Sequence, residues 1–319
     1  MTTSTDTRQD WRGLDLLKFI LAFFIVAAHC RLAEEWPPIK NLFGELFSIA
    51  VPLYFAISSF LFIKKLDGLE EERKPWLIKH YLVRLSILFC VWYCLSFPVT
   101  FQRWWKVASL KESLFAILLG CTAWGYWFIK ALGVNLLLLY LFRKKTSLIF
   151  WLFLSLAVYL IFAYNSIFDF FYFPYRPYYS FYYHTAYCCL GACLARSPQA
   201  LLFLERNSPL LILGGLMVFI ATQFVPLSPV FQLASIVLVF PCFSKLTNGR
   251  DLKYLRNKST IIYMSQFIVI YYYDHLCEET SPILCSSPIR FFIVSALCLA
   301  IASASISLEK SLPFFKYLR

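Results

Sequence analysis

Charged side chains are scarce in this chain: Asp, Glu, Lys and Arg together make up 15% of its 319 residues. Hydrophobic residues make up 60% and aromatic residues 19%, which lies far outside the composition of soluble globular domains. A helix needs about 20 apolar residues to span a bilayer, and runs of that length recur along the sequence. The shortage of charge therefore excludes a soluble domain and predicts an integral membrane protein.

The apolar runs also lack the alternation of apolar and polar residues that a transmembrane β-barrel requires. Segments such as 132–142 and 148–163 are apolar on every side, which favours an all-α membrane fold. About ten transmembrane helices are expected, at roughly 15–33, 46–63, 82–100, 122–142, 147–164, 181–196, 209–225, 230–244, 259–273 and 290–308. The apolar piece at 113–120 is too short to cross and is expected to form a half-helix on the outer side.

Basic residues are distributed unevenly between the two sides of these spans. If the N-terminus is cytoplasmic, 21 of the 30 basic residues lie on the inner side, seven on the outer side and two inside spans. The positive-inside rule then predicts that both termini are cytoplasmic and that the chain is a multi-pass protein of the cell membrane. This distribution accounts for the net charge of +12 without a nucleic-acid partner.

No tract of domain size lies outside the spans, so we expect one membrane-embedded domain over residues 1–319 with no soluble appended domain. The first apolar run resembles a signal peptide, but His29 stands before the possible cut, where a small residue is required, so the run is expected to remain as the first helix. The eleven cysteines lack CxxC pairs and Cys/His metal spacing, so no metal is expected. Cys277 and Cys285 share the last outer loop, and the sequence leaves their pairing open.

The first helix carries two ionisable residues in an apolar run, Lys18 and His29. They are eleven residues apart, so they lie about 20° apart around the helix and about 16 Å apart along it. In one interpretation Lys18 snorkels to the inner headgroups and His29 marks the outer interface. In the other the two residues form a functional stripe, because ionisable residues inside a membrane mark sites and histidine transfers protons near neutral pH.

Residues 14–29 read Leu-Asp, two residues, a basic residue, ten residues and His. This pattern resembles the first helix of the membrane acyltransferase-3 family, although arginine is commoner there at the position of Lys18. Four further stretches are similar to motifs of that family, in the same order: 51–62, 81–87, 127–128 and 259–266. Three residues depart from those motifs: Ser59 replaces a glycine, and Gly125 and Gln266 replace histidines.

The resemblance implies an integral membrane O-acyltransferase. It implies transfer of an acyl group, with acetyl expected, from cytoplasmic acyl-CoA to a hydroxyl of an extracytoplasmic glycan or related acceptor. Lys18 and Arg84 would bind the anionic part of the donor, lysine as a point charge and arginine as a fork. His29 would act either as general base or as acyl carrier, and the sequence leaves both roles open.

Six further residues are candidates for contact with the substrates: Glu34, Glu35, Ser58, Trp127, Tyr263 and Gln266. Ser58 and Tyr263 could donate hydrogen bonds to an oxyanion, and Glu34 and Glu35 could orient His29. Helix packing explains the two hydroxyl residues equally well, and solvation in an outer loop explains the two glutamates. The sequence makes no prediction about oligomeric state.

A second function is consistent with the same stripe. A transporter or exporter of a glycan or lipid-linked intermediate could use Lys18 and His29 to line its pathway. The chain lacks paired Gly/Pro-broken helices in corresponding halves, which many such transporters have. This absence and the ordered motifs favour the acyltransferase.

Overall fold

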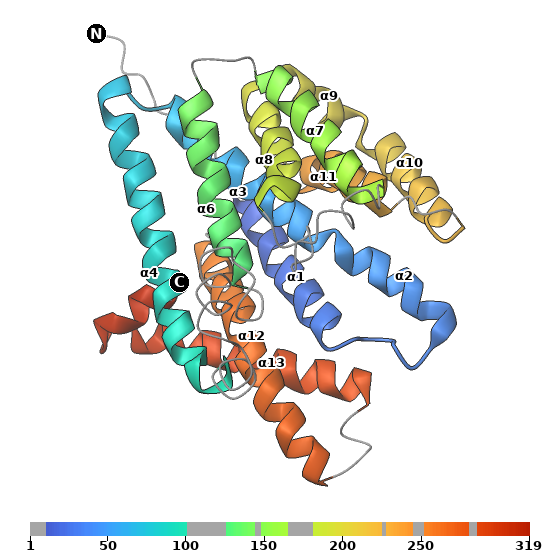
Figure 1. The fold of residues 1–319 in the computed structure, drawn as a ribbon, viewed down its shortest axis with the longest axis vertical. Coiled ribbons are helices and arrows are strands. Elements are labelled where there is room, and N and C mark those ends of the chain that lie inside the picture. The colour runs from blue at the N-terminus through green and yellow to red at the C-terminus, as the bar shows by residue number, and fades with distance from the viewer. Residues whose placement is uncertain are drawn as a thin grey trace.

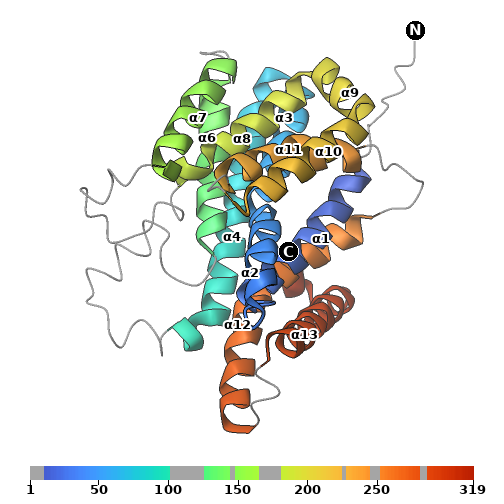
Figure 2. The same ribbon diagram turned by 90° about the vertical axis from the view of Figure 1, so that its right-hand side faces the viewer.

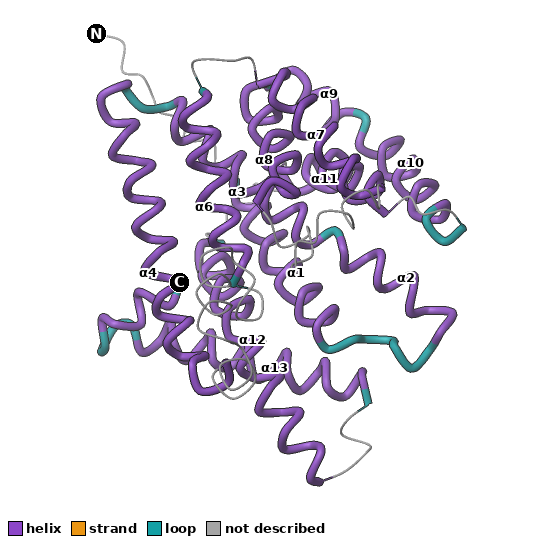
Figure 3. The backbone as a smooth tube through the Cα atoms, in the orientation of Figure 1, coloured by secondary structure: helices purple, strands orange, loops and turns teal. Residues whose placement is uncertain are grey.

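The computed structural model describes residues 11–100, 126–143, 148–164, 181–224, 228–244, 252–280 and 286–319. Within these ranges every regular element is a helix (Figure 3). The elements are α1 (Arg12–His29), α2 (Pro37–Ser48), α3 (Ala50–Asp67), η1 (Glu71–Arg73), α4 (Lys74–Thr100), α6 (Trp127–Phe142), α7 (Leu148–Tyr164), α8 (Phe181–Arg196), α9 (Pro198–Arg206), α10 (Ser208–Ala221), α11 (Ser228–Ser244), α12 (Lys253–Thr280), α13 (Ser287–Leu308) and η5 (Pro313–Leu318). The half-helix expected at 113–120 lies outside the described residues.

The all-α class is confirmed for the described residues, and each of the expected spans coincides with an α-helix. Three helical stretches in this part of the chain are long and apolar enough to cross a membrane: Ile39–Asp67, Glu71–Val99 and Ser287–Leu308. Helix α1 is not among them, and its 18 residues include three charged side chains, Arg12, Asp15 and Lys18. The described part of the chain therefore has membrane-spanning capacity, and α1 adds charge to an apolar helix.

Helices α2 and α9 were not expected from the sequence. Helix α2 leads into α3 with a single residue, Ile49, between them, so the apolar helix begins well before the span expected at 46–63. Helix α9 follows α8 across a bend of 95°, and Pro198 opens it after Ser197. Proline suits the first position of a helix because its missing N–H would have no partner there, and the same ring prevents α8 from continuing.

Helix α1 lies near the centre of the view in Figure 1 and toward one side of the bundle in Figure 2. It packs against α12, α3 and α11, and α12 packs in turn against α13. Its inward side chains are completely or almost completely buried, as Leu14, Leu21 and Val26 show. Close packing of this kind holds helices together in a bilayer, where the lipid tails are as apolar as the side chains. The charged residues of α1 are therefore held at fixed positions inside the protein.

Two pairs of helices pack in parallel. At the start of α1 and α12 Asp15 lies 3.9 Å from Arg256, and further along the same pair the ring of His29 lies 4.6 Å from the ring of Phe267. In α3 and α8 Gly191 meets the backbone of Ala56, and an Arg196–Asp67 ion pair of 2.7 Å joins the ends of both helices. Parallel neighbours agree with the expected topology, because it places an odd number of crossings between the members of each pair, seven for α1 and α12 and three for α3 and α8.

The turn after α1 is fixed by α13. Arg31 and Ala33 adopt left-handed backbone conformations, with φ of 55° and 69°, which side chains with a Cβ rarely adopt. The hydroxyl of Ser287 accepts a hydrogen bond of 3.2 Å from the backbone N–H of Ala33. The Ser287 N–H donates in turn to the Glu35 carboxylate at 2.6 Å. The end of α1, where His29 lies, is thus tied to the first turn of α13.

Candidate functional site

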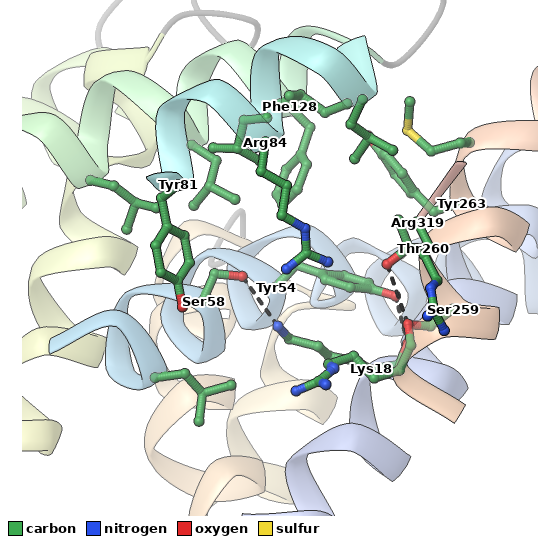
Figure 4. Close-up of a pocket in the computed structure, with 18 of the residues that line it drawn as sticks. Lys18, Tyr54, Ser58, Tyr81, Arg84, Phe128, Ser259, Thr260, Tyr263 and Arg319 are labelled. Carbon is green, nitrogen blue, oxygen red and sulfur yellow. Dashed lines mark hydrogen bonds between the residues drawn. The ribbon is translucent and has the colours of Figure 1, made fainter. Parts of the chain in front are cut away.

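A cavity of about 460 Å³ lies between α1, α3, α4, α6, α12 and the residue that follows η5. Its size is typical of sites for small molecules and cofactors. Figure 4 shows Lys18 at its floor, the Arg84 guanidinium pointing toward it from α4, and Arg319 to one side of both. Segments separated by hundreds of residues therefore direct cationic groups into one space.

Lys18 is the deep cation of the cavity. Its side chain is half-buried, and its ammonium donates a hydrogen bond to the hydroxyl of Ser58 at 3.4 Å (Figure 4). The hydroxyl of Tyr54 donates to the backbone carbonyl of Lys18 at 2.5 Å, which fixes this turn of α1 against α3. A lysine so placed faces an internal cavity, and not the lipid.

Four other cations line the same cavity: Lys65, Arg84, Arg256 and Arg319. Among the described residues that line it none is acidic. Two carboxylates stand behind the wall, since Asp15 lies 3.9 Å from Arg256 and Glu309 bonds to Arg319 at 2.7 Å. The five cations thus exceed their acidic neighbours, and the cavity suits a ligand with several negative charges.

The cavity is polar on one side and apolar on the other. Ser58, Ser259 and Thr260 supply hydroxyl groups near Lys18, and Tyr263 is buried a turn further along α12. The α6 wall is apolar, with Phe128 and Leu132 among its members. A ligand that fills this space needs an anionic end and a less polar end.

His29 is not among the residues that line this cavity. It lies at the end of α1, is exposed, and meets Phe267 edge to face with 4.6 Å between ring centroids. Tyr126 lies beyond Phe267, at 6.2 Å between ring centroids, and its hydroxyl bonds to the carbonyl of Met264, which is a cavity residue. The rings of Phe267 and Tyr126 therefore form an aromatic layer between the cavity and His29. This layer lies beside the face of α12 that packs against α1, the helix that carries Lys18 and His29.

The structure gives the other sequence candidates different surroundings. Glu34 is exposed and lies 3.5 Å from both Arg31 and Lys40. Glu35 bonds to the first turn of α13, as described above. Trp127 stacks on the buried His184 of α8 at 4.9 Å between ring centroids.

Gln266 is fully buried beside the cavity, and not in its wall. Its amide donates to the backbone carbonyl of Tyr263 at 3.0 Å. The structure thus brings Lys18, Arg84, Ser58 and Tyr263 to one cavity and leaves His29 and the remaining candidates outside it.

The sequence did not identify three of the cavity cations, Lys65, Arg256 and Arg319, and Lys65 was counted only among the inner-side basic residues. Arg256 lies in a basic stretch at the start of α12 that was interpreted only as an inner-side charge, although it stands one turn before the motif at 259–266. Arg319 lies after the last expected span, and no local pattern distinguishes it from other basic residues. Only the fold brings these two guanidinium groups to Lys18.

Within the described ranges no three His, Cys, Asp or Glu side chains gather as they would to hold a metal ion. Cys277 is buried on α12, and Cys285 lies outside the described residues, so their pairing stays open.

A family model described as an acyltransferase domain, that of the acyltransferase-3 family, matches residues 11–307 of the chain. No match was found among curated proteins or among solved structures.

Proposed function

The chain belongs to the acyltransferase-3 family and is an acyltransferase, and we propose that its donor is a cytoplasmic acyl-CoA and its acceptor a hydroxyl of an extracytoplasmic glycan. Acetyl is the acyl group that we propose, so that the donor is acetyl-CoA. The observation that carries the proposal is the cavity that five cations line. The family supplies the reaction, and the cavity supplies the chemistry by which the donor is held.

Acyl-CoA carries its phosphates at one end and its thioester at the other. The cavity has the same polarity, with Lys18 and Arg84 among the cations on one side and an apolar wall on the other. We assign Lys18 and Arg84 to the donor phosphates, because charge-assisted hydrogen bonds to phosphate are about twice as strong as neutral ones. Lysine acts there as a point charge and arginine as a planar fork.

His29 is the residue that we assign to the chemistry, in one of two roles. As general base, its imidazole takes the proton of the acceptor hydroxyl while the hydroxyl oxygen attacks the thioester carbon and the thiolate of coenzyme A leaves. As acyl carrier, its imidazole nitrogen first attacks the thioester and releases the thiolate, and the hydroxyl then attacks the acyl-imidazole. Ser58 and Tyr263 have hydroxyl groups at the cavity that could stabilise the oxyanion of either step.

The remaining candidates take supporting roles in this proposal. Glu34, exposed near the His29 end of α1, contacts the acceptor. Glu35 positions the turn after His29 through its bond to Ser287. Trp127 stacks on His184 and so packs α6 against α8, and Gln266 is buried on α12 next to the cavity, bonded to its own helix.

We propose that residues 1–319 form one membrane domain with ten spans and both termini in the cytoplasm of the cell. The parallel packing of α1 with α12 and of α3 with α8 supports this topology, and so does the excess of basic residues on the expected inner side. The basic cavity then opens toward the cytoplasm, and His29 lies toward the opposite face of the cell membrane.

The test uses purified protein in lipid vesicles, with radiolabelled acetyl-CoA on the side of the basic cavity and an oligosaccharide acceptor on the other side. We expect label to appear on the acceptor, and His29→Ala to abolish this transfer. His275→Ala is the matched control, because His275 is an exposed histidine of α12 outside the cavity. Transfer that survives in His29→Ala would contradict the role of His29, and glycan flux without acylated product would contradict the enzymatic proposal.

A further inference from the structure

A second cavity, of about 580 Å³, adjoins the first. The two cavities share three residues, Arg84, Arg256 and Arg319, which therefore stand at the boundary between them. The second cavity adds His80, Asn257 and Tyr317 to these arginines. The basic site thus has two compartments, and the arginines face both.

The last residues of the chain build part of the second compartment. Element η5 packs across α4, where the indole N–H of Trp92 donates to the backbone carbonyl of Leu318 at 3.0 Å. The side chain of Leu318 is buried, and Glu309 accepts a hydrogen bond of 2.7 Å from Arg319. These contacts hold Tyr317 and Arg319 in the cavity wall, and both residues lie beyond the part of the chain that the family model matches, 11–307.

The second compartment has the groups that a phosphorylated nucleotide requires. Its three guanidinium groups supply forked donors for phosphate oxygens, and the bond to Glu309 uses only one nitrogen of a side chain that has five N–H donors. His80 stacks on Trp76 with 5.2 Å between ring centroids, and Tyr317 is exposed. The rings of His80 and Tyr317 are therefore available to stack on a purine. Asn257 adds an amide for the edge of a base.

We propose that this second compartment binds the adenosine 3′-phosphate end of the acyl-CoA donor, with Arg256 and Arg319 on the 3′-phosphate and Tyr317 against the adenine. The inference rests on the proposed donor, and it goes beyond that proposal because it assigns residues outside the matched domain. A 3′-phosphomonoester carries about −1.5 to −2 charge, more than either phosphate of the diphosphate, each of which carries a single charge. Two guanidinium groups at the boundary of both compartments are suited to that charge, and Lys18 and Arg84 are left for the diphosphate.

The test measures equilibrium binding of radiolabelled coenzyme A and of 3′-dephospho-coenzyme A to the purified full-length protein in lipid nanodiscs. We expect coenzyme A to bind about tenfold to a hundredfold more tightly than the dephospho form, as one or two charged hydrogen bonds imply. Arg319→Ala is expected to remove most of this preference by weakening coenzyme A alone, and Arg319→Lys to retain part of it. Tyr317→Ala is expected to weaken both ligands equally.

Arg206→Ala is the matched control, because Arg206 is an exposed arginine of α9, on the same expected side of the membrane and outside both cavities. It is expected to leave both affinities unchanged. Equal binding of the two ligands by the unaltered protein would overturn the inference while leaving acyl transfer from acetyl-CoA intact. Binding of neither ligand would overturn the donor assignment and this inference together.

Discussion

Substitution of Gly191 by alanine tests the contact on which the Lys18 side of the cavity depends. A Cβ atom at this position would lie 2.2 Å from the carbonyl oxygen of Ala56 and 2.6 Å from the hydroxyl of Ser59, both on α3. Contacts below 3.0 Å are essentially never seen for real Cβ atoms, so α8 and α3 must separate by about 0.8 Å at this point. Overpacking of this kind costs about 1–3 kcal/mol.

The displacement also has a functional consequence. Ser58 bonds to the Lys18 ammonium and lies next to Ser59 on α3, so a shift of α3 moves the floor of the cavity. We expect Gly191→Ala to lower the apparent melting temperature in detergent by several degrees and to raise the KM for acetyl-CoA. Thermal unfolding followed by tryptophan fluorescence measures the first effect, and donor saturation measures the second.

Gly214 of α10 provides the control, since a Cβ there would meet nothing within 4 Å. Gly214→Ala is expected to change stability by no more than about 0.5 kcal/mol and to leave the KM unchanged. If the two alanine variants unfolded at the same temperature, the steric argument for the α3–α8 contact would be wrong.

Two further predictions concern the ends of α1. Lys18→Met should raise the KM for acetyl-CoA by about tenfold or more, as loss of a charged phosphate contact implies, whereas Lys18→Arg should keep it close to the unaltered value; equal donor saturation in all three proteins would refute this role. Glu35→Ala removes the acceptor of the Ser287 N–H at the start of α13, which should lower the free energy of unfolding by about 1 kcal/mol. It should also lower kcat with little effect on the donor KM, because it loosens the turn after His29. Glu35→Gln keeps an acceptor oxygen and should restore most of kcat, and a change confined to the donor KM would contradict a positioning role.

The helices could be predicted from the sequence because apolar runs are a local property of the chain. Helix α2 was missed because Lys40, Asn41 and Glu45 interrupt its apolar pattern, although the helix continues almost directly into α3. Helix α9 was missed because the expected span ended at Arg196 and the composition that follows does not indicate a further short helix. The presence of a helix can be predicted from hydropathy, whereas its bends and extensions depend on the other helices against which it packs.

The site was predictable only in part, for a related reason. Lys18 could be found because a charge in an apolar run is conspicuous, and helical periodicity predicts that it shares one stripe of the helix with His29. Arg256 and Arg319 could not be found, because basic residues at helix ends are expected wherever a chain meets the cytoplasmic surface. The two guanidinium groups converge on Lys18 because α1 packs against α12 and because η5 packs across α4. The sequence around Arg256 and Arg319 does not indicate either of these contacts.

The distribution of charge in the cavity determines how a donor must lie in it. The five cations come from α1, α3, α4, α12 and the residue after η5, whereas the cavity residues of α6 are all apolar. A reversed donor would place its phosphates against Phe128 and Leu132, where an unpaired charge is strongly disfavoured. If the cations hold the phosphates of the proposed acyl-CoA donor, its thioester end would point along α12 toward Tyr263 and the aromatic layer in front of His29.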